Sequence, residues 1–203
     1  MRIFEYFNNN DILWMPINLT VSEEQDEKGK REKTLEPYNE ENVRPDYSKD
    51  FDNLKLIKKR QKYTNYIYGG VDTRQFQHID VDFEKNKTYT EETIEYVNNL
   101  KNNTPYFLSV GKGKPHFIIK DLTLKNKNRY QTKFEDIEIL SGQWAYFKIN
   151  DEMYNYEKNI IPLDEGIVED INQVIPKQPK KTKKICNSSN SSNSSNIDPL
   201  LKK

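Results

Sequence analysis

The sequence predicts an α+β fold in which helices cover one face of a sheet. The run Phe76–Phe83 alternates polar and apolar residues, which is the pattern of a strand with one buried face. A helical pattern follows this run, and further strand-like runs follow the helix within residues 64–150. The order strand, helix, strand, strand fits a sheet with its helices gathered on one side.

The composition predicts one domain of ordinary size with polar tails. The 203 residues carry no net formal charge, 34% are hydrophobic and 32% are charged, and the mean hydropathy is −1.00. The middle of the chain holds nearly all the apolar patterning, so the core is expected there. The neutral balance argues against a generic nucleic-acid coat, which needs a basic excess, but it leaves room for a local basic groove.

The cysteine and apolar content predicts a soluble protein of the reducing cytoplasm. Cys186 is the single cysteine, so we expect no disulfide framework and no cysteine-ligated zinc within this chain. No apolar run approaches the ~20 residues of a membrane span. Residues 1–19 lack the order of segments that a signal peptide has.

The first third of the chain predicts little regular structure. An apolar patch within residues 12–19 predicts one strand, and the charged segment Ser22–Asp52 predicts a flexible arm because its few apolar residues lack periodicity. Basic residues with spaced apolar ones predict a helix within Leu54–Tyr66. Tyr66–Tyr68 predicts a short strand, and Gly69-Gly70 predicts a turn after it.

The core elements follow in order after the strand at 76–83. Thr88 and Glu91 match a capping box, in which two side chains satisfy each other's backbone donors, so a helix is expected from here to about Lys101. The other predicted elements are strands at Tyr106–Val110 and His116–Lys120 joined by a tight hairpin, a polar loop at Lys125–Lys133, and strands at Phe134–Leu140 and Gln143–Ile149.

Three segments are expected along the chain. Residues 1–53 form an N-terminal segment that includes the charged arm, and residues 54–165 form the principal domain. Residues 166–203 are basic and then rich in Ser-Ser-Asn units, and this low-complexity composition predicts a disordered tail.

Asp80 and Asp82 are the most informative residues of the sequence. On a strand they share a face with His78, opposite an Ile-Val-Phe face. Neighbouring carboxylates repel each other unless a cation lies between them, and a hard divalent ion such as Mg²⁺ or Mn²⁺ prefers oxygen ligands. The alternative is a half-exposed edge strand with two solvated aspartates.

The hairpin Ser109–His116 predicts an anion-binding turn. Its two glycines let the backbone approach an anion closely, Lys112 and Lys114 supply positive charge, and His116 offers a donor to a phosphate oxygen. The spacing differs from that of a P-loop, and no helix is expected directly after it. The alternative is a hairpin turn that merely carries lysines.

Glu138 predicts a third acid on a neighbouring strand. It lies between two isoleucines, so on a strand its side chain faces away from them. Asp136, two positions earlier, would lie on the same face and is the alternative third acid. The alternative is an ordinary outward acid. Together with the aspartate pair and the basic hairpin, such an acid gives what nucleotidyl transfer needs: carboxylates for two metal ions, and cations for a triphosphate.

At these residues the sequence resembles the archaeo-eukaryotic primase superfamily of primases and primase-polymerases. The Asp-x-Asp strand is Asp80-Val81-Asp82, the hairpin that ends in histidine is Ser109–His116, and the third acidic strand falls at Glu138. The likeness is greatest to the branch in large nucleocytoplasmic DNA viruses, the giant viruses among them. That branch has segments similar to Pro105–Ser109 and Leu140–Trp144 in the same order.

The resemblance covers about residues 64–150 and implies an RRM-like catalytic sheet that works as a DNA primase in viral DNA replication. It implies Mg²⁺ or Mn²⁺, NTP or dNTP substrates, a single-stranded DNA template, and a place in the host cytoplasm or viral factory. The site residues that it implies are Asp80, Asp82 and Glu138 as metal ligands, Ser109, Lys112, Lys114 and His116 as nucleotide contacts, and Arg74 and His78 as supporting or template contacts.

The sequence departs from the family pattern in three respects. The third acid is Glu instead of the usual Asp, no cysteine cluster offers a zinc element, and no helicase domain follows. A stand-alone enzyme, a subunit of a separate helicase, and an inactive truncated replication protein that binds DNA or a helicase are therefore all consistent with it. Another Asp-x-Asp enzyme, a glycosyltransferase or a metal nuclease, is a further alternative.

Overall fold

The computed structural model describes residues 1–26, 31–120 and 129–168. The helices in these ranges are α1 (Ile3–Asn9), α2 (Tyr47–Asp50), α3 (Leu54–Arg60), α4 (Glu91–Asn103) and a 3₁₀ helix at Glu165–Ile167. The strands are β1 (Trp14–Gln25), β2 (Arg31–Glu36), β3 (Tyr68–Asp72), β4 (Gln77–Val81), β5 (Tyr106–Leu108), β6 (Pro115–Lys120), β7 (Arg129–Gln131), β8 (Ile137–Leu140), β9 (Trp144–Lys148) and β10 (Ile161–Pro162).

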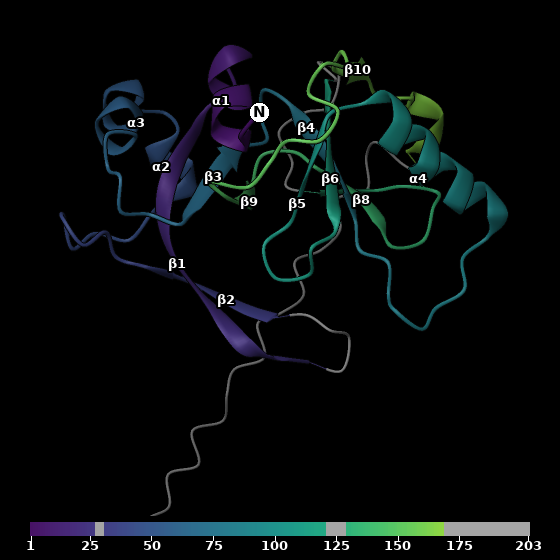
Figure 1. Cartoon of the computed structure of the whole chain (residues 1–203), viewed down its shortest axis with the longest axis horizontal. Coiled ribbons are helices and arrows are strands. Elements are labelled where there is room, and N and C mark those ends of the chain that lie inside the picture. Colours follow the sequence, from purple (N-terminus) through teal and green to yellow (C-terminus); the bar gives the residue numbers. More distant parts are fainter. Residues whose placement is uncertain (27–30, 121–128, 169–203) are drawn as a thin grey trace, which may run out of the picture.

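The described strands form two sheets that lie beside each other (Figure 1). One has the order β2-β1-β3-β9, and the other has the order β10-β6-β4-β8-β7 with β5 paired to β6. Pairing is antiparallel except between β10 and β6. The predicted α+β class is confirmed at this level, whereas the single sheet of the prediction is in fact two.

The six-stranded sheet buries one face against α4 and turns the other toward the four-stranded sheet. Ile79 and Val81 of β4 pack in one core with Val97 and Leu100 of α4. The alternate positions lie on the opposite face, where the second core contains Ile118 of β6 with residues of α1, β3 and β9. Strand periodicity therefore places His78, Asp80 and Asp82 on the side between the sheets.

The four-stranded sheet has helices on its outer side. Met15, Ile17 and Leu19 of β1 pack there with Phe51, just after α2, and with Ile57 of α3. Helices therefore cover an outer face of each sheet, and the predicted restriction of helices to one face is wrong for the molecule as a whole. The physical reason is that both sheets have an apolar face that needs cover.

The predicted turn at Gly69 and Gly70 is wrong, because both glycines lie inside β3. A Cβ added at Gly69 would lie 2.4 Å from Cζ of Phe147, and one added at Gly70 would lie 1.9 Å from Cε3 of Trp144. The glycines thus make room for two aromatic rings of the neighbouring strand β9. Their role is to permit close packing within the sheet. The prediction was wrong because it treated glycine only as a turn residue.

The predicted flexible arm at Ser22–Asp52 is wrong for most of its described part. β2 pairs with β1, and Tyr38 is fully buried with its hydroxyl donating to the carbonyl of Pro16 at 2.9 Å. Arg60 of α3 then ties the segment down, since it bonds Asp50 at 2.6 Å and Glu41 at 3.0 Å. The ion pairs of this buried cation with two acids fix the conformation of the segment, and a search for apolar periodicity does not detect them.

Other boundaries shift by a few residues. The N-cap of α4 is Thr90, whose Oγ1 accepts from the amide of Thr93, and the helix continues to Asn103. The predicted capping residue Thr88 is therefore two positions early. The polar loop lies partly outside the described residues, since these resume at β7. Of the predicted tail, residues 169–203 lie outside them too, and the domain boundaries at 53 and 165 stay predictions.

Within the described part of the chain, no helix has both the length and the apolar character that crossing a bilayer requires.

Candidate functional site

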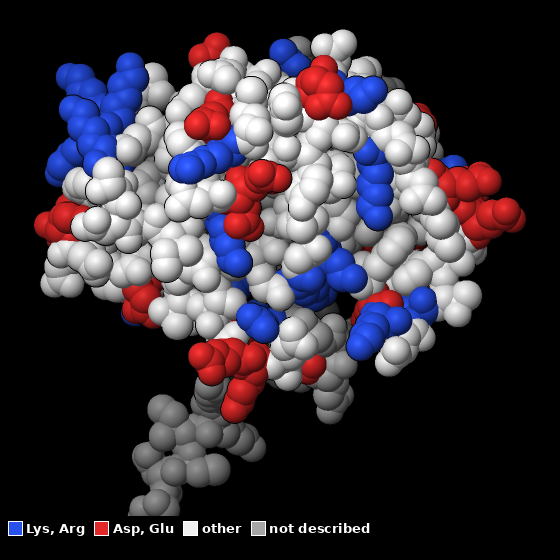
Figure 2. Space-filling view, viewed as in Figure 1, with Lys and Arg blue, Asp and Glu red and all other residues white. Residues whose placement is uncertain are grey.

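A cleft of about 460 Å³ opens between the two sheets. Figure 2 shows basic side chains gathered around a hollow in the lower half of this face, above the β1–β2 hairpin. Its lining comes from both sheets and from the connections around them: Arg31, Lys33, Tyr47, Asp80, Asp82, Ser109, Lys112, His116, Arg129, Leu140, Gly142, Gln143, Trp144, Ala145 and Tyr146. Five of the residues singled out from the sequence therefore lie around one cavity.

Strand register explains how the acids come together. Asp80 of β4 is paired with His116 of β6 on one side and with Glu138 of β8 on the other. Asp82 follows just after β4 on the same face. The three strands thus carry an acidic row, which we define as Asp80, Asp82 and Glu138, with His116 at its edge.

Each acid of the acidic row lies next to a cationic or ionisable group. Nε2 of His116 is 3.2 Å from Oδ1 of Asp80, Nζ of Lys112 is 3.1 Å from Oδ1 of Asp82, and Nε of Arg129 is 3.1 Å from Oε2 of Glu138. The His116 contact has the distance but not the angle of a hydrogen bond, so Oδ1 of Asp80 is buried without a hydrogen-bond partner. That oxygen is a buried acceptor still open to a donor or a cation.

The surroundings of the two partly buried acids shift their pKa values in opposite directions. Burial alone would raise the pKa of Asp80, but His116, with Arg129 and Lys33, lowers it below its usual range. Burial raises the pKa of Glu138, Arg129 opposes this, and the charges of Asp80 and Asp82 add to the rise. The effect of these two aspartates on Glu138 shows that the three carboxylates share one electrostatic environment.

Asp136, the competing third acid, lies in a different setting. It has a positive φ of 57° in the turn before β8, and its Oδ2 accepts from Nζ of Lys87 at 2.9 Å and from the hydroxyl of Tyr89 at 2.7 Å. Neither Asp136 nor Glu138 is among the residues that line the cleft, but Glu138 has the position opposite Asp80 in the strand pair. The register thus favours Glu138 over Asp136.

The predicted anion-binding turn is closed by its own backbone. The amide of Ser109 donates to the carbonyl of Lys114 at 2.7 Å, and Oγ of Ser109 accepts from the amide of Lys114 at 3.1 Å. Gly111 has a φ of 100° and Gly113 has a φ of 64°, which is backbone that glycine adopts easily. The turn presents Lys112 to the cleft, next to Asp82.

Three of the predicted contacts lie away from the cleft. Lys114 lines a separate groove of about 240 Å³ beside α4. Arg74 is engaged by Asp72 at 3.0 Å and Asp52 at 2.7 Å. His78 is fully buried against Phe107, and burial, helped by His116, lowers its pKa to about 3.

Prediction from the sequence missed six residues of the cleft: Arg31, Lys33, Tyr47, Arg129, Ala145 and Tyr146. The first three lie in the segment that was predicted to be a flexible arm. One signal was present in the alternation of Arg31 and Lys33 with Glu32 and Thr34, which is the pattern of a strand with one basic face. Arg129 had no such signal, because it lies in the predicted polar loop.

The donors of the acidic row fit a hard divalent cation by their chemistry, since they are carboxylate oxygens and one of them lacks a hydrogen-bond partner. The geometry, in contrast, is not that of a formed metal site. In the residues that the structure describes, no three His, Cys, Asp or Glu side chains converge closely enough to hold a metal ion. Two of the three carboxylates are instead paired with Lys112 and Arg129.

Comparison of the chain with models of protein families and with curated proteins gives no match.

Proposed function

We propose that this chain is a nucleotidyltransferase of the primase-polymerase kind, which joins NTPs or dNTPs on a single-stranded DNA template in viral DNA replication. The observation that carries the proposal is the cleft, because it collects Asp80, Asp82 and Lys112 from motifs far apart in the sequence. An RRM-like catalytic sheet is part of the same proposal. It is supported by a mostly antiparallel sheet that carries α4 on one face and the acidic row on the other.

The charges of the cleft suit a polyphosphate. In the chain alone, Lys112 is paired with Asp82 and His116 lies beside Asp80. With a nucleotide bound, Lys112 and His116 would pair with phosphate oxygens, and Asp80, Asp82 and Glu138 would be the residues that hold Mg²⁺ or Mn²⁺. The ion, once bound, would activate the attacking hydroxyl and neutralise the leaving pyrophosphate.

The experiment is incorporation of labelled NTPs and dNTPs on single-stranded DNA, with and without a primer, in Mg²⁺ and in Mn²⁺. We expect product from the native chain and a loss of at least about a hundredfold in Asp80→Asn/Asp82→Asn, because the isosteric amides keep the shape and remove the negative charge. Glu92→Gln, which changes an exposed acid of α4 (69% exposed), is the control and should incorporate normally.

Absence of product from a folded native chain, in both metals and both primer conditions, contradicts the proposal. The ion pairs of the site then favour the second candidate, a replication protein that binds DNA or a helicase without catalysis. Under that alternative, the acidic row is neutralised by Lys112 and Arg129 with no metal. DNA binding by the native chain and by the double asparagine variant would then be equal.

A further inference from the structure

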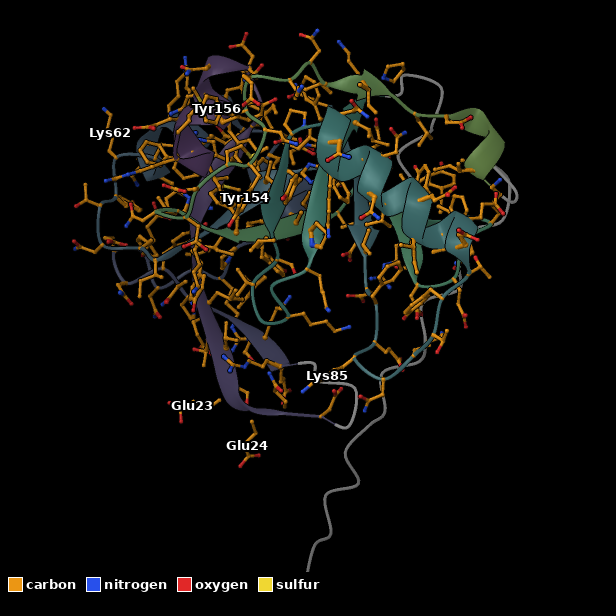
Figure 3. All side chains as sticks on the ribbon, turned by 45° about the vertical axis from the view of Figure 1, so that its right-hand side comes forward. Glu23, Glu24, Lys62, Lys85, Tyr154 and Tyr156 are labelled. Carbon is orange, nitrogen blue, oxygen red and sulfur yellow. The ribbon has the colours of Figure 1, made fainter. Side chains whose placement is uncertain are left out.

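The strand β2 separates its charges between two faces. Arg31 and Lys33 are partly buried and line the cleft, whereas the alternate residues Glu32 and Thr34 are exposed. Figure 3 shows Glu23 and Glu24 at the far end of β1, away from the body of the molecule. In the described part of the β1–β2 hairpin, two basic side chains thus line the cleft, whereas Glu23 and Glu24 lie away from it.

The basic face of β2 lies directly over the anion-binding turn. A Cβ added at Gly111 would lie 3.3 Å from Cε of Lys33 and 3.6 Å from Cβ of Arg31. Nζ of Lys33 is 5.8 Å from the centre of the Tyr146 ring. Two cations from residues near 30 therefore face Lys112, which comes from the hairpin of the motif, across the same cavity.

Arg31 has an unused donor in this position. Its Nε is buried and has no hydrogen-bond partner among the described residues. A buried donor left unpaired costs free energy, and a guanidinium is well matched to the paired oxygens of a phosphate. The feature is costly for the chain alone and becomes favourable when a phosphate group enters.

We propose that Arg31 and Lys33 bind the triphosphate of the incoming nucleotide, so that β2 and the Ser109–His116 hairpin hold it from two sides. This inference rests on the proposed function and names two residues that none of the sequence motifs contains. A compact anion fits the observations, since Arg31 and Lys33 line one cavity together with Lys112. The volume of about 460 Å³ lies within the range of small-molecule sites.

The test is calorimetric titration of the full chain with ATP, with AMP and with a twelve-residue oligothymidylate, all with Mg²⁺ present. We expect Arg31→Gln/Lys33→Gln to weaken ATP binding about tenfold or more and to change AMP binding by much less, because the lost contacts are with the outer phosphates. The charge-matched control is Lys55→Gln/Lys58→Gln on the exposed side of α3, which should bind ATP as the native chain does.

A second variant guards against a loss of fold. Arg31→Lys/Lys33→Arg keeps both charges and should bind ATP within about threefold of the native chain, with unchanged thermal unfolding. Equal ATP binding by the glutamine variant and the native chain overturns the inference, as does an effect on the oligothymidylate alone. So does the absence of ATP binding to the native chain at millimolar concentration.

Nucleotide incorporation separates this inference from the proposed function. Normal incorporation with unaltered ATP affinity in the glutamine variant would be consistent with the proposed function. It would show that Arg31 and Lys33 do not bind the triphosphate. If the glutamine variant binds ATP tenfold more weakly but the native chain makes no product, the phosphate site is supported and the proposed enzymatic function is contradicted.

Discussion

At the scale of single residues, the acidic row is the feature on which the proposed function depends. Asp80 has a buried oxygen without a hydrogen-bond partner, and the pKa of Glu138 is raised first by burial and then by the charge of Asp80. A divalent cation bound to these carboxylates would stabilise their charged forms. Binding of a divalent ion should therefore stabilise the fold measurably.

We expect millimolar Mn²⁺ to raise the midpoint of thermal unfolding by several degrees, since a ligand at 100 times its Kd stabilises by about 2.7 kcal/mol. Asp80→Asn/Asp82→Asn should unfold at a temperature that Mn²⁺ does not change. Differential scanning calorimetry with EDTA as the reference measures both. A native chain that is indifferent to Mn²⁺ would count against the metal site.

Strand periodicity predicted that Asp80 and Asp82 share a face, and both line the cleft. Lys112 and His116, which the charge and motif of their hairpin singled out, line it too. Lys114 of the same hairpin lies beside α4 instead. Turn geometry sets the direction of that side chain, and alternation along a strand says nothing about a turn.

At the scale of elements, the segment from 38 to 60 is held by a charged network as well as by apolar packing. Glu41 accepts from Nζ of Lys59 at 2.7 Å, from Arg60 at 3.0 Å and from the hydroxyl of Tyr63 at 3.0 Å. The Lys59 bond lowers the pKa of Glu41 to about 2, helped by Arg60 and Tyr63 and opposed by burial. The arrangement attaches the preceding segment to α3.

We expect Glu41→Gln to lower the free energy of unfolding at pH 7 by about 1–3 kcal/mol, because Arg60 loses one of its two anionic partners. The unfolded carboxyl takes up its proton near its ordinary pKa of 4.5, above the folded pKa of about 2. Its stabilisation is therefore complete above pH 4.5 and is lost as the pH falls toward 2.

The measurement is urea unfolding of the native chain and the variant at several pH values. The difference between them should shrink steadily from pH 4.5 to pH 2. The exposed ion-pair variant Glu92→Gln should differ from the native chain by less than about 0.5 kcal/mol throughout. A difference that is constant with pH would show that the Glu41 carboxylate is not the source.

At the scale of the whole molecule, the N-terminal residues belong to the same packed unit as the site. β1 lies between β2 and β3 in the sheet, and Phe7 of α1 packs edge-on against Phe107 and Phe147. Sequence periodicity located most strands but gave no sign of their division into two sheets. That division depends on contacts between residues far apart in the chain, such as Met15 with Gly70.

We expect the fragment 54–168 to lose cooperative thermal unfolding, because it lacks β1, the neighbour of β3, and the aromatic residues that α1 gives to the second core. The matched control, residues 1–168, keeps every described element and should unfold cooperatively. Circular dichroism and calorimetry on the two fragments decide this. A cooperative 54–168 fragment would support the domain boundary that was predicted at residue 53.

The alternation along β4 also limits how the chain can misfold. A shift of one residue in its pairing would move Asp80 into the core beneath α4 and move Ile79 into the cleft. Such a slip would desolvate a carboxylate with no cation beside it, and the wrong register would be penalised as soon as it formed. The acids that we assign to the proposed chemistry therefore also favour the correct strand register when the sheet assembles.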